Sequence, residues 1–284
     1  MVMDIDTLNA KAKLLKSYID EPPILVLPNV WDAGSAKIVE NAEFPVIATS
    51  SGGIAWSRGY SDGEWISREE MLSVVARISA NVSLPVTADL ESGYGPDEGS
   101  LAETVIAALE AGAVGANFED SINGPNGRKL IEFDRSVARL KAAREAALSV
   151  GVHFVINART DTFAGGGNDS SFPEAIRRAN AYLRVGADCI FIPFINNINV
   201  IRELVKEIHG PVNILVGAAS PTVQELQDVG VARVSIGGLF SLVNYANVHS
   251  ACDELRQNGT YGWAANALPH PKMNALMAIE DSET

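Results

Sequence analysis

The chain has 284 residues, 47% of them hydrophobic and 20% charged, with a formal net charge of −13. One α/β barrel of about 250 residues with a single core accounts for this length. The acidic charge argues against nucleic acid as a partner, because phosphate binding depends on clustered Lys and Arg. The apolar stretches fall short of the roughly 20 residues that cross a bilayer, so we expect no membrane partner.

The first residues and the cysteines favour a cytoplasmic protein. The opening Met-Val-Met-Asp-Ile-Asp has neither a basic region nor a long apolar segment, so we expect no secretory signal. Cys189 and Cys252 lie far apart in the chain and lack the spacing of metal ligands. Neither a disulfide framework nor a zinc site is therefore expected.

Short runs of β-forming residues alternate with segments of helical periodicity along the chain. Helical segments such as 135–148 and 173–185 can carry the chain from one strand to the next, which gives a parallel sheet. Eight such units predict a (β/α)8 TIM barrel in one domain that spans 1–284. The predicted strands are 24–28, 45–50, 85–89, 113–118, 153–159, 188–193, 212–216 and 232–236.

Two connections are longer than a barrel requires, at 51–66 and 121–133. Long ordered loops on the catalytic rim of a barrel are usually functional. The second connection contains Asn-Gly-Pro-Asn-Gly-Arg-Lys, and its glycines and polar residues predict a flap that closes over the site. A disordered surface loop is the alternative.

Acidic residues follow two neighbouring predicted strands. Asp89 and Glu91 end the third strand, and Glu119 ends the fourth. The carboxyl ends of barrel strands form the catalytic rim, and side-chain alternation allows Asp89 and Glu91 to point to the same side. Mg²⁺ prefers oxygen ligands and keeps waters, so these acids predict a magnesium site, with Mn²⁺ as the alternative cation. The plain alternative is that one or more of them caps a helix or is solvated.

Arg159 ends the fifth predicted strand, where its guanidinium can bind a carboxylate or phosphonate with two hydrogen bonds. The alternative is a salt bridge to Asp161 or Glu119. No lysine or histidine lies at a predicted strand end, which argues against a Schiff-base aldolase and a His-ligated zinc aldolase. An oxygen-bound metal beside an arginine suits the stabilisation of an enolate.

Glycine-rich segments follow three of the predicted strands. In Ser-Ser-Gly-Gly at 50–53, glycines allow backbone N–H groups to approach a small anion. A rival phosphate site is offered by 217–220 and 237–238, which follow the last two strands. Glycine also serves tight turns between strands and helices, so both readings stay open.

Five ordered motifs carry a family resemblance: Leu-Pro-Asn-Val-Trp-Asp-Ala-Gly-Ser-Ala, Ala-Thr-Ser-Ser-Gly-Gly, Ala-Asp-Leu-Glu-Ser-Gly-Tyr-Gly, Asn-Phe-Glu-Asp and Asn-Ala-Arg-Thr-Asp. From about Leu27 to Leu276 the chain resembles the isocitrate lyase and phosphoenolpyruvate mutase superfamily. Members bind a 2-oxo or enol acid against Mg²⁺ and break or form a neighbouring C–C or P–C bond. The resemblance also implies that the eighth helix is swapped between subunits of a homodimer or homotetramer, with 258–284 as an arm on the neighbouring subunit.

The resemblance assigns roles to particular residues of this chain. It implies that the metal is held by Asp89, Glu91 and Glu119 and that the substrate is bound by Trp31, Ser50, Gly52, Gly53, Asp89, Asn123 and Arg159. The catalytic group would comprise Asp62, Arg128, Lys129 and Arg159.

The flap departs from the lyase pattern. Related lyases carry Lys-Lys-Cys-Gly-His there, with the Cys as proton donor, whereas this flap has neither Cys nor His and offers Asn123, Asn126, Arg128 and Lys129. The proton donor is therefore not identifiable from the sequence. At the sixth strand, where relatives keep His or Glu, this chain is apolar.

The resemblance implies a Mg²⁺-dependent lyase acting on a small anionic carboxylate. It would cleave the C–C bond next to the oxo or hydroxyl carbon of a 2-oxo or 2-hydroxy acid through an enolate, as a decarboxylase or a retro-aldol enzyme. One alternative is P–C bond chemistry, as a phosphonopyruvate hydrolase or phosphoenolpyruvate phosphomutase. Another is a non-catalytic binding protein on the same fold.

Overall fold

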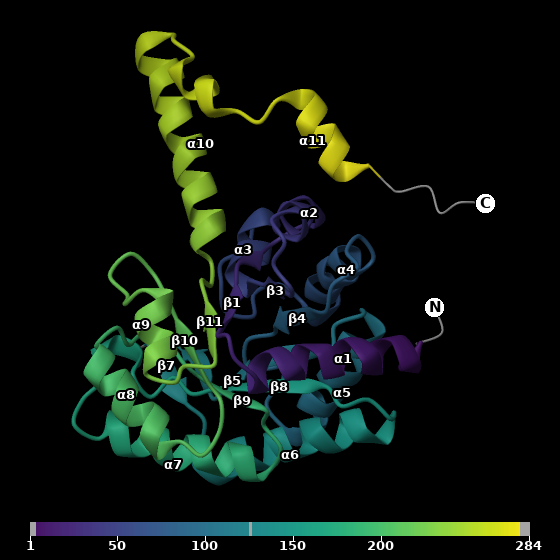
Figure 1. Ribbon diagram of the computed structural model, residues 1–284, viewed down its shortest axis with the longest axis vertical. Coiled ribbons are helices and arrows are strands. Elements are labelled where there is room, and N and C mark those ends of the chain that lie inside the picture. Colours follow the sequence, from purple (N-terminus) through teal and green to yellow (C-terminus); the bar gives the residue numbers. More distant parts are fainter. Residues whose placement is uncertain (1–3, 125–126, 279–284) are drawn as a thin grey trace.

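A closed parallel barrel forms the body of the molecule in the computed structural model, which describes residues 4–124 and 127–278 (Figure 1). Its nine strand segments follow the order β1-β11-β10-β9-β8-β5-β4-β3-β2. β1 (Leu25–Leu27) pairs with β11 (Arg233–Ser235), and β2 (Asn29–Val30) pairs with β3 (Ile47–Thr49). Only Pro28 separates β1 from β2, and proline has no N–H for a strand ladder. The two segments therefore act as one strand, and the eight-stranded barrel is confirmed.

The remaining barrel strands lie where the sequence predicts them, within two residues at either end. They are β4 (Val86–Asp89), β5 (Gly115–Glu119), β8 (Val155–Arg159), β9 (Cys189–Ile192) and β10 (Val212–Leu215). Their residues are mostly buried, as expected for a parallel sheet covered by helices. Asn29 connects the strands at which the barrel closes. Its Nδ2 donates to the Thr49 carbonyl, and its Oδ1 accepts from the N–H groups of Ile236 and Gly237.

Helices surround the barrel, and several begin at side-chain caps. Asp32, Ser67 and Asp97 accept a backbone N–H at the starts of three of them. The helices are α1 (Ile5–Asp20), α2 (Ala33–Asn41), α3 (Ser51–Ser57), α4 (Arg68–Ser79), α5 (Glu98–Glu110), α6 (Phe133–Ser149), α7 (Ser171–Arg184), α8 (Ile198–Glu207), α9 (Val223–Asp228), α10 (Leu239–Asn258) and α11 (His270–Met277). Short 3-10 turns lie at Ala164–Gly166 and Gly262–Asn266.

The long connection after β5 is an antiparallel hairpin rather than an irregular loop. β6 (Ser121–Gly124) pairs with β7 (Gly127–Leu130), with Asn123 opposite Arg128 and Ile122 opposite Lys129. Opposed residues in such a pair share a face, and neighbours alternate between faces. The hairpin therefore presents Asn123 and Arg128 on one side and Ile122 and Lys129 on the other.

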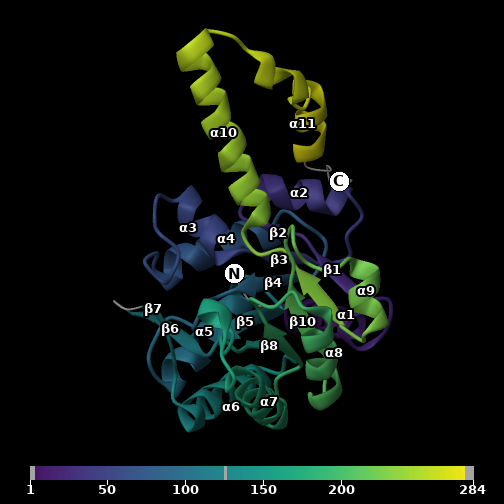
Figure 2. The same cartoon turned by 90° about the vertical axis from the view of Figure 1, so that its left-hand side faces the viewer.

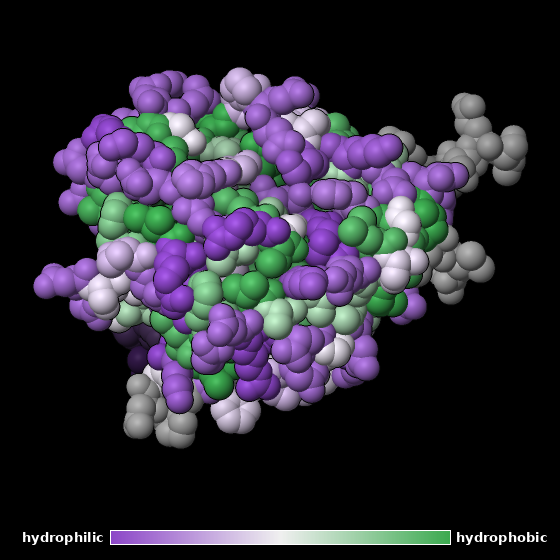
Figure 3. Space-filling view, turned by 90° about the horizontal axis from the view of Figure 1, so that it is seen from below, coloured by the Kyte–Doolittle hydropathy of each residue, from purple (hydrophilic) through white to green (hydrophobic). Residues whose placement is uncertain are grey.

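The eighth helix stands away from the barrel (Figures 1 and 2). Ser241 is its only residue classed as buried, and apolar residues such as Val243 and Val248 are more than half exposed. The chain then turns back, and α11 packs against α2. Hydrophilic and apolar residues are mixed on the face opposite α10 (Figure 3). Among the described residues, no helix has both the length and the apolar character needed to span a membrane.

Candidate active site

A pocket of about 320 Å³ opens at the carboxyl ends of the barrel strands. Eight residues that the sequence singles out line it: Ser50, Gly52, Asp62, Asp89, Glu91, Glu119, Arg128 and Arg159. They come from the ends of β3, β4, β5 and β8 and from the two long connections. The remaining lining residues are Asn29, Ser51, Trp56, Asn117, Phe191, Phe194, Leu215, Ser235, Gly237 and Gly238.

Two arginines and two acids form a closed ring of ion pairs at one side of the pocket. Arg128 Nη1 lies 2.7 Å from Glu119 Oε1 and 2.6 Å from Asp161 Oδ2. Arg159 contacts Glu119 Oε2 through Nη1 and Asp161 Oδ1 through Nε, both at 2.7 Å. Burial raises the pKa of Glu119 to about 7, and the charges of Arg159 and Arg128 oppose this rise. Both salt bridges considered for Arg159 are formed.

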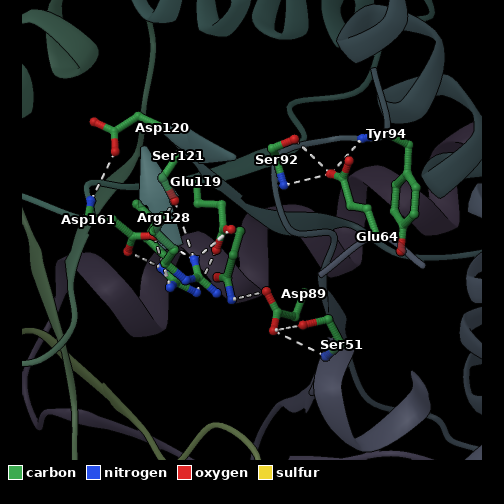
Figure 4. A network of polar contacts seen from close by, with 12 residues as sticks. Ser51, Glu64, Asp89, Ser92, Tyr94, Glu119, Asp120, Ser121, Arg128 and Asp161 are labelled. Atoms are coloured by element: carbon green, nitrogen blue, oxygen red, sulfur yellow. Dashed lines mark hydrogen bonds and ion pairs between the residues drawn. The ribbon is translucent and has the colours of Figure 1, made fainter. Parts of the chain in front are cut away.

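Asp89 is held at the end of β4 by donors from neighbouring elements (Figure 4). Its Oδ2 accepts from the Ser51 N–H at 3.1 Å and from Ser51 Oγ at 2.8 Å. Asn117 Nδ2 lies 3.4 Å from Asp89 Oδ1. Donors from α3 and β5 thus fix the orientation of this carboxylate.

Glu91 reaches the pocket through a turn. β4 ends at Asp89, and Glu91 has φ +51°, which is left-handed backbone. The sequence argument from strand alternation is therefore wrong for this pair, although both residues line the pocket. Glu64 supports the turn, since its Oε1 accepts hydrogen bonds from the Ser92 N–H, Ser92 Oγ and the Tyr94 N–H (Figure 4).

The Glu91 carboxylate is buried and chemically unsatisfied. Its side chain is 3% exposed, and neither oxygen has a hydrogen-bond partner among the described residues. Burial raises the pKa of Glu91 to about 8, and the nearby charges of Asp62, Asp89 and Glu119 add to the rise, while the backbone N–H of Glu64, which lies near the carboxylate without the geometry of a hydrogen bond, opposes it. A buried carboxylate of this kind ordinarily pairs with a cation or binds a metal.

The predicted metal acids share the pocket without forming a compact cage. Over residues 4–124 and 127–278, no three His, Cys, Asp or Glu side chains converge on a single direct metal position. Mg²⁺ usually keeps several waters and is held through few direct carboxylate bonds. The two free oxygens of Glu91, beside the fixed Asp89, fit such a water-rich cation.

Trp56 lines the pocket, and its ring leaves no room for a side chain at two neighbouring glycines. A Cβ on Gly52 would lie 3.2 Å from its ring, and a Cβ on Gly238 would lie 3.1 Å from it. Both distances are tighter than ordinary contacts of a Cβ. Gly52 and Gly238 therefore make room for the indole in the pocket wall.

Two phenyl rings lie against Arg159. The guanidinium carbon is 5.6 Å from the centre of the Phe191 ring and 5.7 Å from that of Phe194. Such distances suit cation–π contacts. The apolar sixth strand noted in the sequence thus contributes an aromatic cover for the arginine.

Four predicted residues lie outside the pocket lining. Trp31 borders a second cavity with Arg58 and Arg77, and Gly53 lies between Trp31 and Ser241. Asn123 packs against the backbone of Gly63, where its amide occupies the space of a side chain. Lys129 is exposed on the opposite face of the hairpin from Arg128. Asn126 lies outside the described residues.

Asp120 belongs to a separate network, although it follows Glu119 directly. Its Oδ1 accepts from the Asp161 N–H (Figure 4), and its Oδ2 accepts from Arg178 and Tyr182. This buried network ties the end of β5 to α7. Two backbone N–H groups of the rival phosphate site already have hydrogen-bond acceptors nearby. The Gly237 N–H donates to Asn29 Oδ1, and the Gly217 N–H donates to Ser220 Oγ.

An eight-stranded parallel barrel with an acid-rich pocket at the carboxyl ends of its strands is the architecture of an α/β-barrel enzyme. Residues 15–256 match the phosphoenolpyruvate phosphomutase family. The chain belongs to this family and is an enzyme of the isocitrate lyase and phosphoenolpyruvate mutase superfamily. The resemblance drawn from the five motifs is confirmed.

Individual relatives agree with this placement. The 2-methylisocitrate lyase of Escherichia coli K12 is 30% identical over 266 residues, which cover 89% of this chain and 87% of the relative. The crystal structure of a "putative lyase/mutase" from Burkholderia cenocepacia J2315 is 34% identical, with a TM-score of 0.90 over 97% of this chain and 98% of that one. The structure of oxaloacetate acetylhydrolase with its product oxalate shares the fold, with a TM-score of 0.85 at 24% identity and coverage of 96% of each chain.

Proposed function

We propose that this enzyme is a Mg²⁺-dependent lyase that cleaves the C–C bond next to the oxo or hydroxyl carbon of a small 2-oxo or 2-hydroxy carboxylate. The observation that carries the proposal is the unsatisfied Glu91 carboxylate in the same pocket as Asp89 and the Arg159 guanidinium. Such a set of groups supports a cation site and an anion-binding group for one small substrate.

The charge of the pocket supports a bound cation. Four acids and two arginines line it, so its formal charge is −2 with all groups ionised: Asp62, Asp89, Glu91, Glu119, Arg128 and Arg159. An anionic substrate would be repelled from this pocket unless a divalent cation balanced the charge. Asp89 and Glu91 would hold that cation, partly through waters, with Glu119 and Asp62 behind them. When bound, Mg²⁺ supplies Lewis-acid polarisation of the substrate oxygen.

The residues of the chain bind and orient the substrate. Arg159 is fixed by Glu119 and Asp161 on one side and by aromatic rings on the other, so it is preorganised to attract a carboxylate. Ser50 and Gly52 border the position where the head of the substrate would lie. Arg128 extends from the hairpin over the acids and helps to exclude water.

A decarboxylation or a retro-aldol cleavage suits this hairpin best. The leaving group is then CO₂ or an aldehyde, and the electron pair of the broken bond passes into the enolate. The hairpin offers Asn123, Arg128 and Lys129 but neither Cys nor His. CO₂ or an aldehyde can leave without a proton from a Cys or His of the flap. These two reactions therefore agree with the residues of the hairpin.

Cleavage or transfer of a P–C bond is the second candidate. The family match favours it, and so do the two guanidiniums of Arg128 and Arg159 in one pocket, because arginine binds phosphonate oxygens well. A third reading, a binding protein without catalysis, predicts ligand binding without turnover.

Product analysis separates these functions. The enzyme would be incubated with Mg²⁺ and oxaloacetate, phosphonopyruvate or branched malates, and products would be followed by ¹H and ³¹P NMR, with Asp89→Ala as control. Formation of pyruvate from oxaloacetate, or of an aldehyde or a 2-oxo acid from a branched malate, supports C–C cleavage. Inorganic phosphate or a phosphoenolpyruvate signal would establish P–C chemistry instead. Mg²⁺-dependent oxalate binding without any turnover would support the binding protein.

The exposed eighth helix supports an oligomer. We propose that α10 and the first part of the arm, 258–269, pack on a neighbouring subunit in a homodimer or homotetramer, whereas α11 lies against α2 of its own chain. The apolar side chains that such packing would cover, each at least 36% exposed in the single chain, are Leu239, Phe240, Leu242, Val243, Tyr245, Val248, Leu255, Tyr261, Trp263 and Leu268. An apolar surface of this size is typical of a protein interface.

A further inference from the structure

Glu91 enters the pocket on a turn of unusual backbone, residues 91–95, the Glu91 turn. The angle φ is +51° at Glu91, +98° at Gly93 and +57° at Tyr94. Any side chain larger than that of glycine disfavours left-handed backbone, so Glu91 and Tyr94 hold these angles only because neighbouring groups enforce them. The position of the Glu91 carboxylate therefore depends on the contacts of the turn.

Glu64 binds N–H groups of the Glu91 turn. Its Oε1 accepts from the Ser92 N–H at 3.0 Å, from Ser92 Oγ at 2.7 Å and from the Tyr94 N–H at 3.1 Å (Figure 4). Hydrogen bonds to an ionised carboxylate are stronger than those between neutral groups. Glu64 belongs to the long connection after β3, so this contact fixes the turn against another loop of the rim.

Arg139, on α6, binds carbonyl groups of the same turn. Its Nη2 donates to the Ser92 carbonyl at 2.5 Å and to the Gly95 carbonyl at 2.9 Å. The residue is only 3% exposed, and within the described part of the chain it has no ion pair and its Nε has no hydrogen-bond partner. A buried charge without a carboxylate partner is costly. The hydrogen bonds found for this guanidinium go to the Glu91 turn.

The two residues lie behind the active site rather than in it. Arg139 lines a cavity of about 10 Å³, close to the space of one water, together with Ser92, Glu119 and Arg159. Glu64 borders a separate cavity. Neither side chain belongs to the described lining of the active-site pocket. Each can therefore influence a bound cation only through the turn.

We propose that Glu64 and Arg139 are positioning residues that together hold Glu91 in the geometry in which it binds the cation. The inference rests on the proposed function, in which Asp89 and Glu91 hold Mg²⁺. Ser92 directly follows Glu91 and is held at both of its backbone groups. Glu64 accepts from its N–H, and Arg139 donates to its carbonyl. Without either contact the turn relaxes toward ordinary backbone, and the Glu91 carboxylate leaves its place in the pocket.

Metal affinity tests this inference without requiring turnover. The dissociation constant of Mn²⁺ would be measured by electron paramagnetic resonance, with circular dichroism and thermal unfolding to verify the fold. Glu64→Leu and Arg139→Met should each weaken Mn²⁺ binding by about 10–100-fold, as the loss of a residue that orients a metal ligand commonly does. Glu64→Gln retains an acceptor oxygen for the turn and should stay within about threefold of the wild type.

Glu103→Leu is the matched control and should leave Mn²⁺ affinity unchanged. It removes an acid that lines the same cavity as Glu64 but contacts Arg68. Glu64 is partly exposed on a connection, so its variants should fold and decide the question even if Arg139→Met does not fold.

Two results would overturn the inference and keep the proposed function, provided that the wild type binds Mn²⁺. One is wild-type affinity in a folded Glu64→Leu or Arg139→Met variant. The other is a loss in Glu64→Gln as large as in Glu64→Leu, because an acceptor for the N–H groups of the turn would then not suffice. Failure of the wild type to bind Mn²⁺ overturns the proposed function, and the inference with it.

Discussion

Glu91→Gln should stabilise the protein in the absence of metal. The Glu91 carboxylate is buried, its oxygens have no hydrogen-bond partner among the described residues, and its pKa is raised to about 8 by burial. The rise from 4.5 to about 8 corresponds to roughly 5 kcal/mol at about 1.36 kcal/mol per pKa unit. Relaxation and entry of water lower this value, so we expect about 2–3 kcal/mol of added stability at pH 8.

The sign of the pH dependence follows from proton binding. Between pH 4.5 and about 8, folded Glu91 retains a proton that the unfolded chain has released. The stability of the wild type therefore falls as the pH rises through this window. The glutamine variant has no such proton, so its advantage over the wild type should be smallest near pH 5 and largest above pH 8.

Thermal unfolding with a chelator, from pH 5 to pH 9, measures this difference. An advantage of about 2–3 kcal/mol corresponds to roughly 4–12 °C in Tm for a domain of this size. Glu21→Gln, which changes an exposed acid at the end of α1, is the matched control. If Glu91→Gln melts at or below the control, or its advantage does not grow with pH, the account of an unsatisfied carboxylate is wrong. With Mg²⁺ and oxalate the order should reverse, since only the wild type retains the charged ligand.

Three further predictions concern other parts of the chain. Arg128→Ala removes the contacts of the hairpin with Glu119 and should lower kcat/KM by about 10–100-fold, measured at steady state, while oxalate still binds. Arg233→Met should cost little stability in chemical unfolding, because Arg233 is fully buried and no ion pair to it is found within the described residues. It should weaken Mg²⁺-dependent oxalate binding, because Arg233 Nη2 donates to Asn117 Oδ1 and Asn117 in turn contacts Asp89. Val243→Asp should reduce the oligomer to monomers in light scattering, whereas Val223→Asp on α9 should not, because only Val243 lies on the proposed interface.

The barrel strands and the acids at their ends could be predicted because each depends on local sequence. A buried parallel strand is a short apolar run, and the residue that follows it lies at the rim in any such barrel. Asp89, Glu119 and Arg159 are therefore placed by the chain direction alone. Glu91 reaches the pocket for a different reason, a left-handed turn that strand alternation does not anticipate.

The positions of the aromatic residues in the pocket could not be predicted in this way, because they depend on how the connections fold back over the rim. The family resemblance implies that Trp31 binds the substrate, whereas Trp56 lines the pocket and Trp31 borders another cavity. One signal was present: Gly52 precedes Trp56 by four residues, which places both on one face of a helix. For Phe194 the signal was an aromatic residue directly after a strand-ending proline.

The pocket combines residues that match the family motifs with residues in which this chain departs from them. The acids and Arg159 match the motifs, and in the proposed function they hold the cation and the anionic substrate. The flap and the sixth strand, where the sequence departs from the family, supply Arg128, Phe191 and Phe194 instead. Differences in selectivity within a superfamily arise from such pocket contacts, while charge stabilisation is shared. The chemistry of this enzyme is therefore sought in its acids and Arg159, and its selectivity in Arg128, Phe191 and Phe194.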